Sequence, residues 1–148
     1  MNSMPDVTLV KTIPAAARQV FEAWLDPKAL VRFMCPAPGS SVSQVEVDAR
    51  VGGSFLIMMN VGGKDLPHRG QYLEITRYER LVFSWQSVHA GEGSRVTLRF
   101  EPLPSGHTRL TLEHEGLPSE ARSPHESGWT HILGELTALL GDAGTDLN

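Results

Sequence analysis

The chain has 148 residues, of which 41% are hydrophobic and 20% are charged, a composition typical of one soluble globular domain with a hydrophobic core. Its formal net charge of −4 disfavours nucleic acids and acidic membrane surfaces as partners. There is no apolar run of about 18 residues and residues 1–6 show no signal-peptide pattern, so we expect neither membrane insertion nor export. The single cysteine, Cys35, excludes an internal disulfide and favours a cytoplasmic protein, although a cysteine-poor secreted protein would share this feature.

The first part of the chain predicts one strand followed by two short helices. Polar and apolar residues alternate over residues 7–13, which indicates a strand. Pro14 is typical of the first turn of a helix, so we expect the first helix to start there. Asp26-Pro27 then predicts the N-cap and first residue of a second helix, which extends to Phe33.

The middle of the chain predicts about six strands joined by short, glycine-rich turns. The strands are expected over residues 42–48, 54–61, 70–76, 81–87, 95–101 and 108–115. Gly62-Gly63-Lys64-Asp65 and Ala90-Gly91-Glu92-Gly93 have the composition of hairpin loops. Because such short connections join antiparallel neighbours, these segments predict an antiparallel sheet.

The last predicted element is one amphipathic helix that starts near Ser119 or Ser123 and ends at Gly141, before a frayed tail over residues 141–148. Its apolar stripe consists of Trp129, Ile132, Leu133, Leu136, Leu139 and Leu140. A curved sheet wrapped around this helix would bury both apolar surfaces and would often leave a cavity between them. We therefore predict an α+β fold in one domain, residues 1–148, with its core at about residues 7–140 and six or seven antiparallel strands.

Several motifs occur together with the spacing of one known family. They are Asp26-Pro27-Lys28-Ala29-Leu30, Asp48-Ala49-Arg50-Val51-Gly52-Gly53-Ser54-Phe55, Gly70 with Glu74-Ile75, Glu79-Arg80-Leu81-Val82-Phe83-Ser84-Trp85, Gly106-His107-Thr108-Arg109-Leu110-Thr111-Leu112 and His125-Glu126-Ser127-Gly128-Trp129. From about residue 7 to residue 140 the chain resembles the activator-of-heat-shock-protein-90-ATPase-like family of the START/pollen-allergen (SRPBCC) superfamily. The resemblance implies a helix-grip fold and a ligand cavity. The superfamily includes lipid carriers, hormone receptors and aromatase/cyclases, so the resemblance implies no single chemistry.

Strand alternation separates the side chains that should face the helix from those that should face solvent. With residues of the helices added, the predicted ligand-binding set is Trp24, Met34, Phe55, Ile57, Met59, Tyr72, Phe83, Trp85, Leu98, Phe100, Leu112, His114, Trp129 and Leu133. The alternative for each member is that it simply fills a core. The opposite faces should be solvated and carry Thr97, Arg99, Arg109, Thr111 and Glu113.

Three polar residues have both a functional and a structural interpretation. His114 is in phase with the inward residues, so it either contacts a ligand or moves protons, or it is a buried histidine bonded to a neighbour. Glu74 would be a proton donor if it lay beside an apolar pocket, and otherwise an exposed carboxylate or a partner of Arg80. Cys35 is either a reactive thiol or a small packed residue, and no base is linked to it by a motif.

The six histidines do not form a recognisable metal motif. His125 and His131 are six residues apart, which rotates the second side chain by about 240° around a helix. His131 and Glu135 do share a helix face, but one such pair is typical of a surface. Nucleophile-elbow, phosphate-loop and dinucleotide patterns are absent from the sequence. We therefore expect no catalytic residue set, metal or cofactor.

Three functions remain open at this point. The first is the binding of a small hydrophobic or aromatic molecule in the cavity between helix and sheet, by a monomer or homodimer. The second is a cyclase- or hydratase-like enzyme acting in the same cavity. The third is a co-chaperone-like interaction, which the family resemblance implies, although the additional chaperone-gripping domain of the eukaryotic co-chaperones is not expected in 148 residues.

Overall fold

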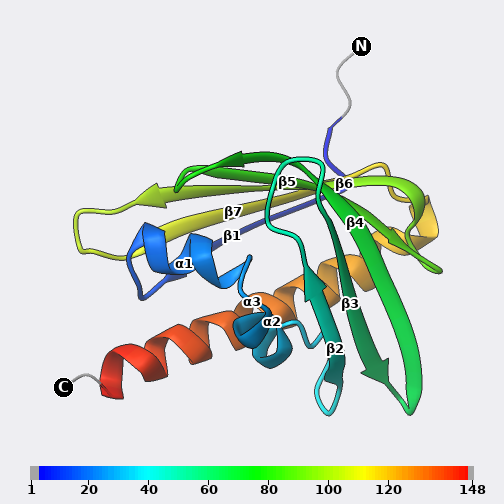
Figure 1. The fold of residues 1–148 in the computed structure, drawn as a ribbon, viewed down its shortest axis with the longest axis horizontal. Coiled ribbons are helices and arrows are strands. Elements are labelled where there is room, and N and C mark those ends of the chain that lie inside the picture. Colours follow the sequence, from blue (N-terminus) through cyan, green and yellow to red (C-terminus); the bar gives the residue numbers. More distant parts are fainter. Residues whose placement is uncertain (1–3, 147–148) are drawn as a thin grey trace.

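Seven antiparallel strands form one sheet in the computed structural model, which describes residues 4–146 and their side chains as far as residue 141 (Figure 1). The strands are β1 (Val7–Ile13), β2 (Ser41–Val47), β3 (Ser54–Val61), β4 (Lys64–Thr76), β5 (Arg80–Ser87), β6 (Gly91–Pro102) and β7 (Thr108–Glu115). Their order is β1-β7-β6-β5-β4-β3-β2, so that β1 returns to pair with β7 at one edge. The prediction of six or seven antiparallel strands is thus confirmed.

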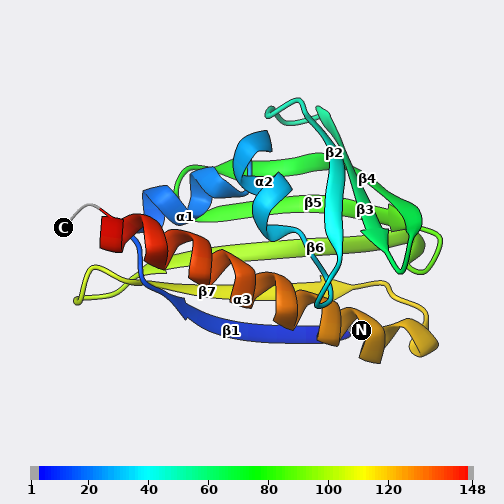
Figure 2. The ribbon, with the colours of Figure 1, turned by 90° about the horizontal axis from the view of Figure 1, so that it is seen from below.

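One long helix lies against the concave face of this sheet. The helices are α1 (Ala17–Ala23), α2 (Pro27–Phe33) and α3 (Arg122–Asp146), and a 3₁₀ turn at Ser119–Ala121 precedes α3. Figure 2 shows α3 running beside β1 and β7, with α1 and α2 covering other strands of the same face. This is the helix-grip arrangement, with two short helices after the first strand, as predicted.

The start of α1 differs from the prediction. The helix begins at Ala17 rather than at Pro14, and Ala16 precedes it with an extended backbone. The carbonyl of Ala15 accepts a hydrogen bond of 2.8 Å from the Thr108 hydroxyl, which holds this segment beside β7. A distant tertiary contact therefore delays the helix by three residues. By contrast, the predicted Asp26 N-cap of α2 is confirmed, because its carboxylate accepts from the Lys28 N–H at 3.0 Å.

Three elements are longer than predicted, namely β4, β6 and α3. Strand β4 starts at Lys64 rather than at Gly70, because residues 64–69 pair with β3 across a tight Gly62-Gly63 turn. Strand β6 likewise starts earlier than predicted, at Gly91 rather than at Arg95. Helix α3 continues beyond Gly141 to Asp146, so the frayed tail predicted from residue 141 is wrong as far as residue 146, and its last two residues lie outside the described part.

The core lies between α3 and the concave face of the sheet. The predicted stripe of α3 is buried from Trp129 to Leu136, and Leu139 and Leu140 pack partly buried against the same core. Asp6 ties the first strand to the start of α3, since its carboxylate accepts from the Leu117 N–H at 2.8 Å and lies 2.9 Å from Arg122. None of the described helices is long and apolar enough to cross a membrane.

Thr97 departs from the predicted alternation, because its side chain is buried although it lies on the convex face. Its neighbours along β6 are Arg95 and Arg99, which form ion pairs with Glu115 and Glu113 of β7. Long paired side chains on both sides cover the short threonine. The other residues predicted on this face remain exposed or half-buried.

Candidate functional site

An open pocket of about 340 Å³ lies between the first turns of α3 and one end of the sheet. Its walls are mostly apolar and come from the loop after α2, strands β3 to β5 and α3. They include Pro36, Met59, Leu66, Trp85, Trp129 and Ile132, with His68, His89 and His125 as the ionisable residues. No aspartate, glutamate, lysine or arginine of the described chain lines it. We call this the histidine-lined pocket.

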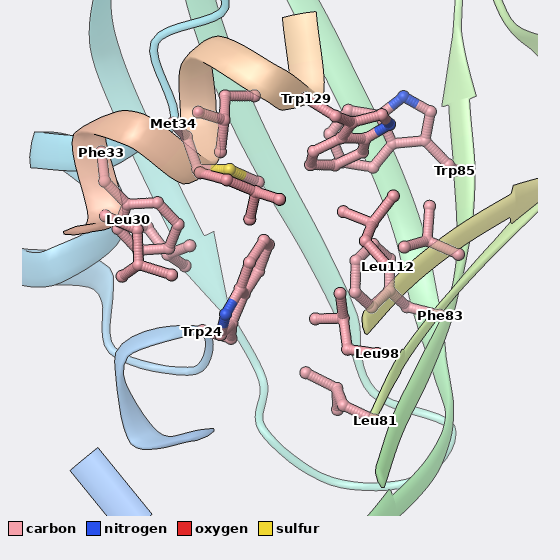
Figure 3. Close-up of a cluster of buried hydrophobic side chains, with 14 of the residues drawn as sticks. Trp24, Leu30, Phe33, Met34, Leu81, Phe83, Trp85, Leu98, Leu112 and Trp129 are labelled. Carbon is pink, nitrogen blue, oxygen red and sulfur yellow. The ribbon is translucent and has the colours of Figure 1, made fainter. Parts of the chain in front are cut away.

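The middle of the space between helix and sheet is filled by side chains. Figure 3 shows Trp24 and Met34 on the helical side facing Leu81, Leu98 and Leu112 on the sheet side. The void that remains between α2 and the strands is about 10 Å³, roughly the room that one water molecule needs. Between the helix and the sheet, room for a ligand therefore exists at the end of the core and not at its centre.

The structure brings some of the predicted ligand-binding residues to the histidine-lined pocket and leaves others in the core. Met59, Trp85 and Trp129 line the pocket. The small central void is surrounded by Trp24, Met34, Phe55, Ile57, Tyr72, Phe83 and also Trp85. The remaining residues pack in the core and line neither space: Leu98, Phe100, Leu112, His114 and Leu133.

Several pocket residues were not singled out from the sequence. His68 and Leu66 lie in the first half of β4, which alternation alone did not identify as strand. His89 lies in the turn between β5 and β6, and Pro36 follows α2. These residues are distant in sequence and belong to turns and element ends, so no periodicity links them. The number of histidines, six in 148 residues, is the one sequence feature that includes His68 and His89, and it does not indicate which of the six lie close together.

His114 is the centre of a fully buried hydrogen-bonded chain. The indole N–H of Trp129 donates to its Nδ1 at 2.9 Å, so this nitrogen is an acceptor and the proton of the neutral ring lies on Nε2. Nε2 lies 2.9 Å from the Ser94 hydroxyl, which in turn donates to the Trp85 carbonyl at 2.6 Å. Burial, together with nearby His125, lowers the pKa of His114 to about 3. Both ring nitrogens are occupied, so His114 is the bonded core histidine of the structural interpretation.

Of the other polar candidates, Glu74 has a structural partner, and burial perturbs the pKa values of Tyr72 and Cys35. Glu74 lies 3.2 Å from Arg80 and is half-exposed, which is the ion pair that was the alternative to an acid role. Tyr72 is buried, and burial raises the pKa of its hydroxyl above the ordinary value. Burial also raises the pKa of the Cys35 thiol, so the thiolate is disfavoured.

Two histidines of the pocket share a bonding pattern. Nδ1 of His68 lies 2.9 Å from the carbonyl oxygen of Leu66, and Nδ1 of His125 lies 2.9 Å from that of Ala121. Burial is the main cause that lowers the pKa of His68 to about 4, and it also lowers the pKa of His125. The His68 ring packs on Trp85 with 5.0 Å between ring centres.

Metal binding finds no support in this geometry. No group of three or more histidine, cysteine, aspartate and glutamate side chains within the described residues is arranged to hold an ion. His131 does share a helix face with Glu135, 3.7 Å away, but its Nδ1 is bonded to the Cys35 carbonyl at 2.7 Å.

The curved sheet, the long helix and the pocket between them define a helix-grip protein. The family described as Activator of Hsp90 ATPase homolog 1-like protein matches residues 14–141. The chain therefore belongs to this family, as its motifs predicted. None of the curated proteins matches the chain.

Solved structures from bacteria and a protozoan share the fold. The protein CV1439 of Chromobacterium violaceum is 30% identical with a TM-score of 0.82, over 90% of this chain and 95% of that one. The AHSA1 protein of Silicibacter pomeroyi is 29% identical with a TM-score of 0.77, over 91% and 96% of the two chains. An HSP90 activator of Plasmodium falciparum is 26% identical with a TM-score of 0.74, over 94% and 97%.

Proposed function

We propose that this protein binds a small hydrophobic or aromatic molecule in the histidine-lined pocket. The observation that carries the proposal is a mostly apolar pocket of about 340 Å³, walled by Trp85 and Trp129, whose described lining contains no aspartate, glutamate, lysine or arginine. Ligand pockets are concave, mostly apolar and of roughly 300–1,000 Å³, so this one suits a small ligand. The two indoles both line the pocket and lie 5.0 Å apart between ring centres, so an aromatic ligand there would contact aromatic rings.

Binding is favoured over the cyclase- or hydratase-like alternative because the two residues that the sequence suggested for proton transfer, His114 and Glu74, are already engaged. Both nitrogens of His114 are hydrogen-bonded, and Glu74 is paired with Arg80 away from the pocket. A general acid or base needs a free position within hydrogen-bonding reach of the reacting group. These residues would have to break existing bonds before they could move a proton.

A co-chaperone-like interaction is the second candidate, and the fold shared with the Plasmodium falciparum HSP90 activator favours it. Such a role would use an exposed apolar surface. The exposed large apolar residues of the described chain come from separate elements, among them Val10 on β1, Val51 before β3 and Val88 after β5. Ligand binding therefore remains the first proposal.

The proposal can be tested by tryptophan fluorescence with one blocking variant. Gly128 lines the pocket, and a Cβ added there would lie 3.5 Å from Pro36, which is an ordinary contact. Gly128→Leu should therefore fill the opening of the pocket without straining the fold. Blocking the space from the core side is less suitable, because Leu98 and Leu112 are fully buried and a tryptophan at either position would overpack the core. Gly134→Leu is the matched control, because Gly134 lies exposed on the same helix with no atom within 4 Å of an added Cβ.

We expect apolar aromatic compounds to change the emission of Trp85 and Trp129 in a saturable way. A Trp24→Phe background removes the third tryptophan, which lies away from the pocket. The response should disappear in Gly128→Leu and persist in Gly134→Leu. If no compound in a broad panel saturates below about 1 mM, roughly −4 kcal/mol, the binding proposal fails and the co-chaperone candidate moves ahead.

A further inference from the structure

The polar atoms of the histidine-lined pocket have a defined hydrogen-bonding character. A carbonyl oxygen only accepts, so the Nδ1 atoms of His68 and His125 must each donate to their carbonyl partners, Leu66 and Ala121. A neutral imidazole has a single N–H, which leaves Nε2 of both rings as an acceptor. The His68 ring has a further backbone hydrogen bond, to Ile57, whereas Ala121 is the one hydrogen-bond partner of His125 among the described residues. Nε2 of His125 is thus an imidazole acceptor that the protein itself does not use, and His68 supplies a second ring nitrogen beside it.

The same pocket offers no fixed charge. Its lining within the described chain contains no acidic or basic side chain other than histidine. Burial lowers the pKa of His68 to about 4 and also lowers that of His125. Nearby His125 lowers the pKa of His68 further, and nearby His89 does the same for His125, so the neutral form of both rings predominates near pH 7. A carboxylate or an ammonium group entering this pocket would lose its hydration without gaining a partner of opposite charge.

The pocket-lining residue Trp85 carries a buried hydrogen-bond donor without a partner among the described residues. This donor is the indole nitrogen. Figure 3 shows this nitrogen on the side of the ring turned away from Leu112 and Phe83, and the His68 ring packs 5.0 Å from the indole ring. A hydroxyl group is the small neutral group that donates to an imidazole nitrogen and can also accept from an indole N–H.

We infer that the ligand of this pocket is a neutral aromatic molecule bearing a hydroxyl group, a phenol-class compound, whose O–H donates to Nε2 of His68 or His125 while its ring packs against Trp85 and Trp129. This inference rests on the proposed binding function and names the chemistry of its ligand. A hydroxyl-bearing ring satisfies a free imidazole acceptor, whereas a plain aromatic hydrocarbon leaves it without a partner when water is displaced. A fatty acid adds a charge that the pocket does not balance.

The test compares three probes that differ in one substituent: 2-naphthol, 2-methoxynaphthalene and 2-naphthoate. Calorimetric titration of the full chain near neutral pH should give an affinity for the naphthol at least about 10-fold higher than for either analogue, a difference of about 1.4 kcal/mol. Equal affinity for the naphthol and its methyl ether, or tightest binding of the carboxylate, would overturn the inference while leaving a hydrophobic site in place. If none of the three binds and Gly128→Leu changes nothing, the binding function itself has failed.

Two histidine variants identify which imidazole accepts the hydrogen bond from the ligand hydroxyl. His125→Phe and His68→Phe keep a ring at each position and remove Nε2, and at least one of them should abolish the preference for the naphthol over its ether. His125 is half-buried near the start of α3, so its variant remains informative if the more buried His68 variant does not fold. His107→Phe, in the exposed turn before β7, is the matched control and should keep the preference. Retention of the preference in both pocket variants would contradict the inference.

Discussion

Trp129 donates a 2.9 Å hydrogen bond from its indole nitrogen to Nδ1 of His114, and both side chains are buried. This bond joins the long helix α3 to strand β7 at Trp129, which also lines the histidine-lined pocket. It also selects the tautomer of His114, because an acceptor at Nδ1 leaves the proton on Nε2, which faces the Ser94 hydroxyl.

Two substitutions of Trp129 should separate packing from hydrogen bonding. Trp129→Ala removes a large buried side chain and should lower the free energy of unfolding by about 3–5 kcal/mol. Trp129→Phe keeps much of the ring contact but leaves Nδ1 of His114 without its donor, at a cost of about 1–3 kcal/mol. Urea unfolding measures both values. An alanine variant that melts within a degree or two of the parent would contradict this placement of Trp129.

The buried histidines should make the protein less stable as the pH falls below about 6.5. The folded-state pKa values of His68 and His114, about 4 and about 3, lie below the unfolded value, so the unfolded chain binds more protons in this window. The free energy of unfolding therefore rises with pH up to about 6.5 and falls on acidification. Between about pH 7 and about pH 5 each of these residues should account for a loss of about 2 kcal/mol.

His114→Asn tests this assignment, since an amide oxygen can still accept from Trp129 but the side chain does not titrate. We expect the variant to lose about 2 kcal/mol less than the parent over the same pH interval, whatever its absolute stability. Urea unfolding at the two pH values gives the comparison. An unchanged pH dependence in the variant would show that His114 does not contribute.

Substitution by alanine should lower the stability of the protein at Gly70 and raise it at Gly134. A Cβ at Gly70 would lie 2.0 Å from the Ser84 carbonyl oxygen and 2.5 Å from the Phe55 ring, so Gly70→Ala must displace the backbone of β5 or the aromatic cluster. Gly134 has no atom within 4 Å of an added Cβ, and Gly134→Ala should stabilise α3 by up to about 1 kcal/mol. Thermal melts of the pair provide the test, and a tolerated Gly70→Ala would refute the close packing of Phe55.

The N-cap of α2 should contribute measurably to stability. Asp26→Ala removes the carboxylate that accepts from Lys28 and should cost about 0.5–2 kcal/mol, whereas Asp26→Asn should retain most of the cap. Helix α2 places Leu30 and Met34 beside the central void, so loosening it should also affect packing there. Equal stability of the alanine and asparagine variants would argue against a capping role.

Local patterns in the sequence were enough to predict the elements and their arrangement. The stripe from Trp129 to Leu136 repeats with the period of a helix, and inward strand residues such as Phe83 and Trp85 alternate with outward ones. These patterns indicate which face of each element is buried. Short turns between strands require antiparallel neighbours. Asp26 before Pro27 marks a helix start, because the capping contact joins residues only two positions apart. Such local signals can be recognised from the sequence alone.

The start of α1, the burial of Thr97 and the site itself depend on contacts between residues that are far apart in the sequence. Ala15 is held by Thr108, and Thr97 is covered by ion pairs that span two strands. Alternation predicts which side chains point inward, but it cannot say whether they leave a space, because filling depends on how side chains from different elements interlock. The tertiary structure alone decided that the centre of the core is filled and that the open pocket lies at its end, where His68 and His125 meet Trp85.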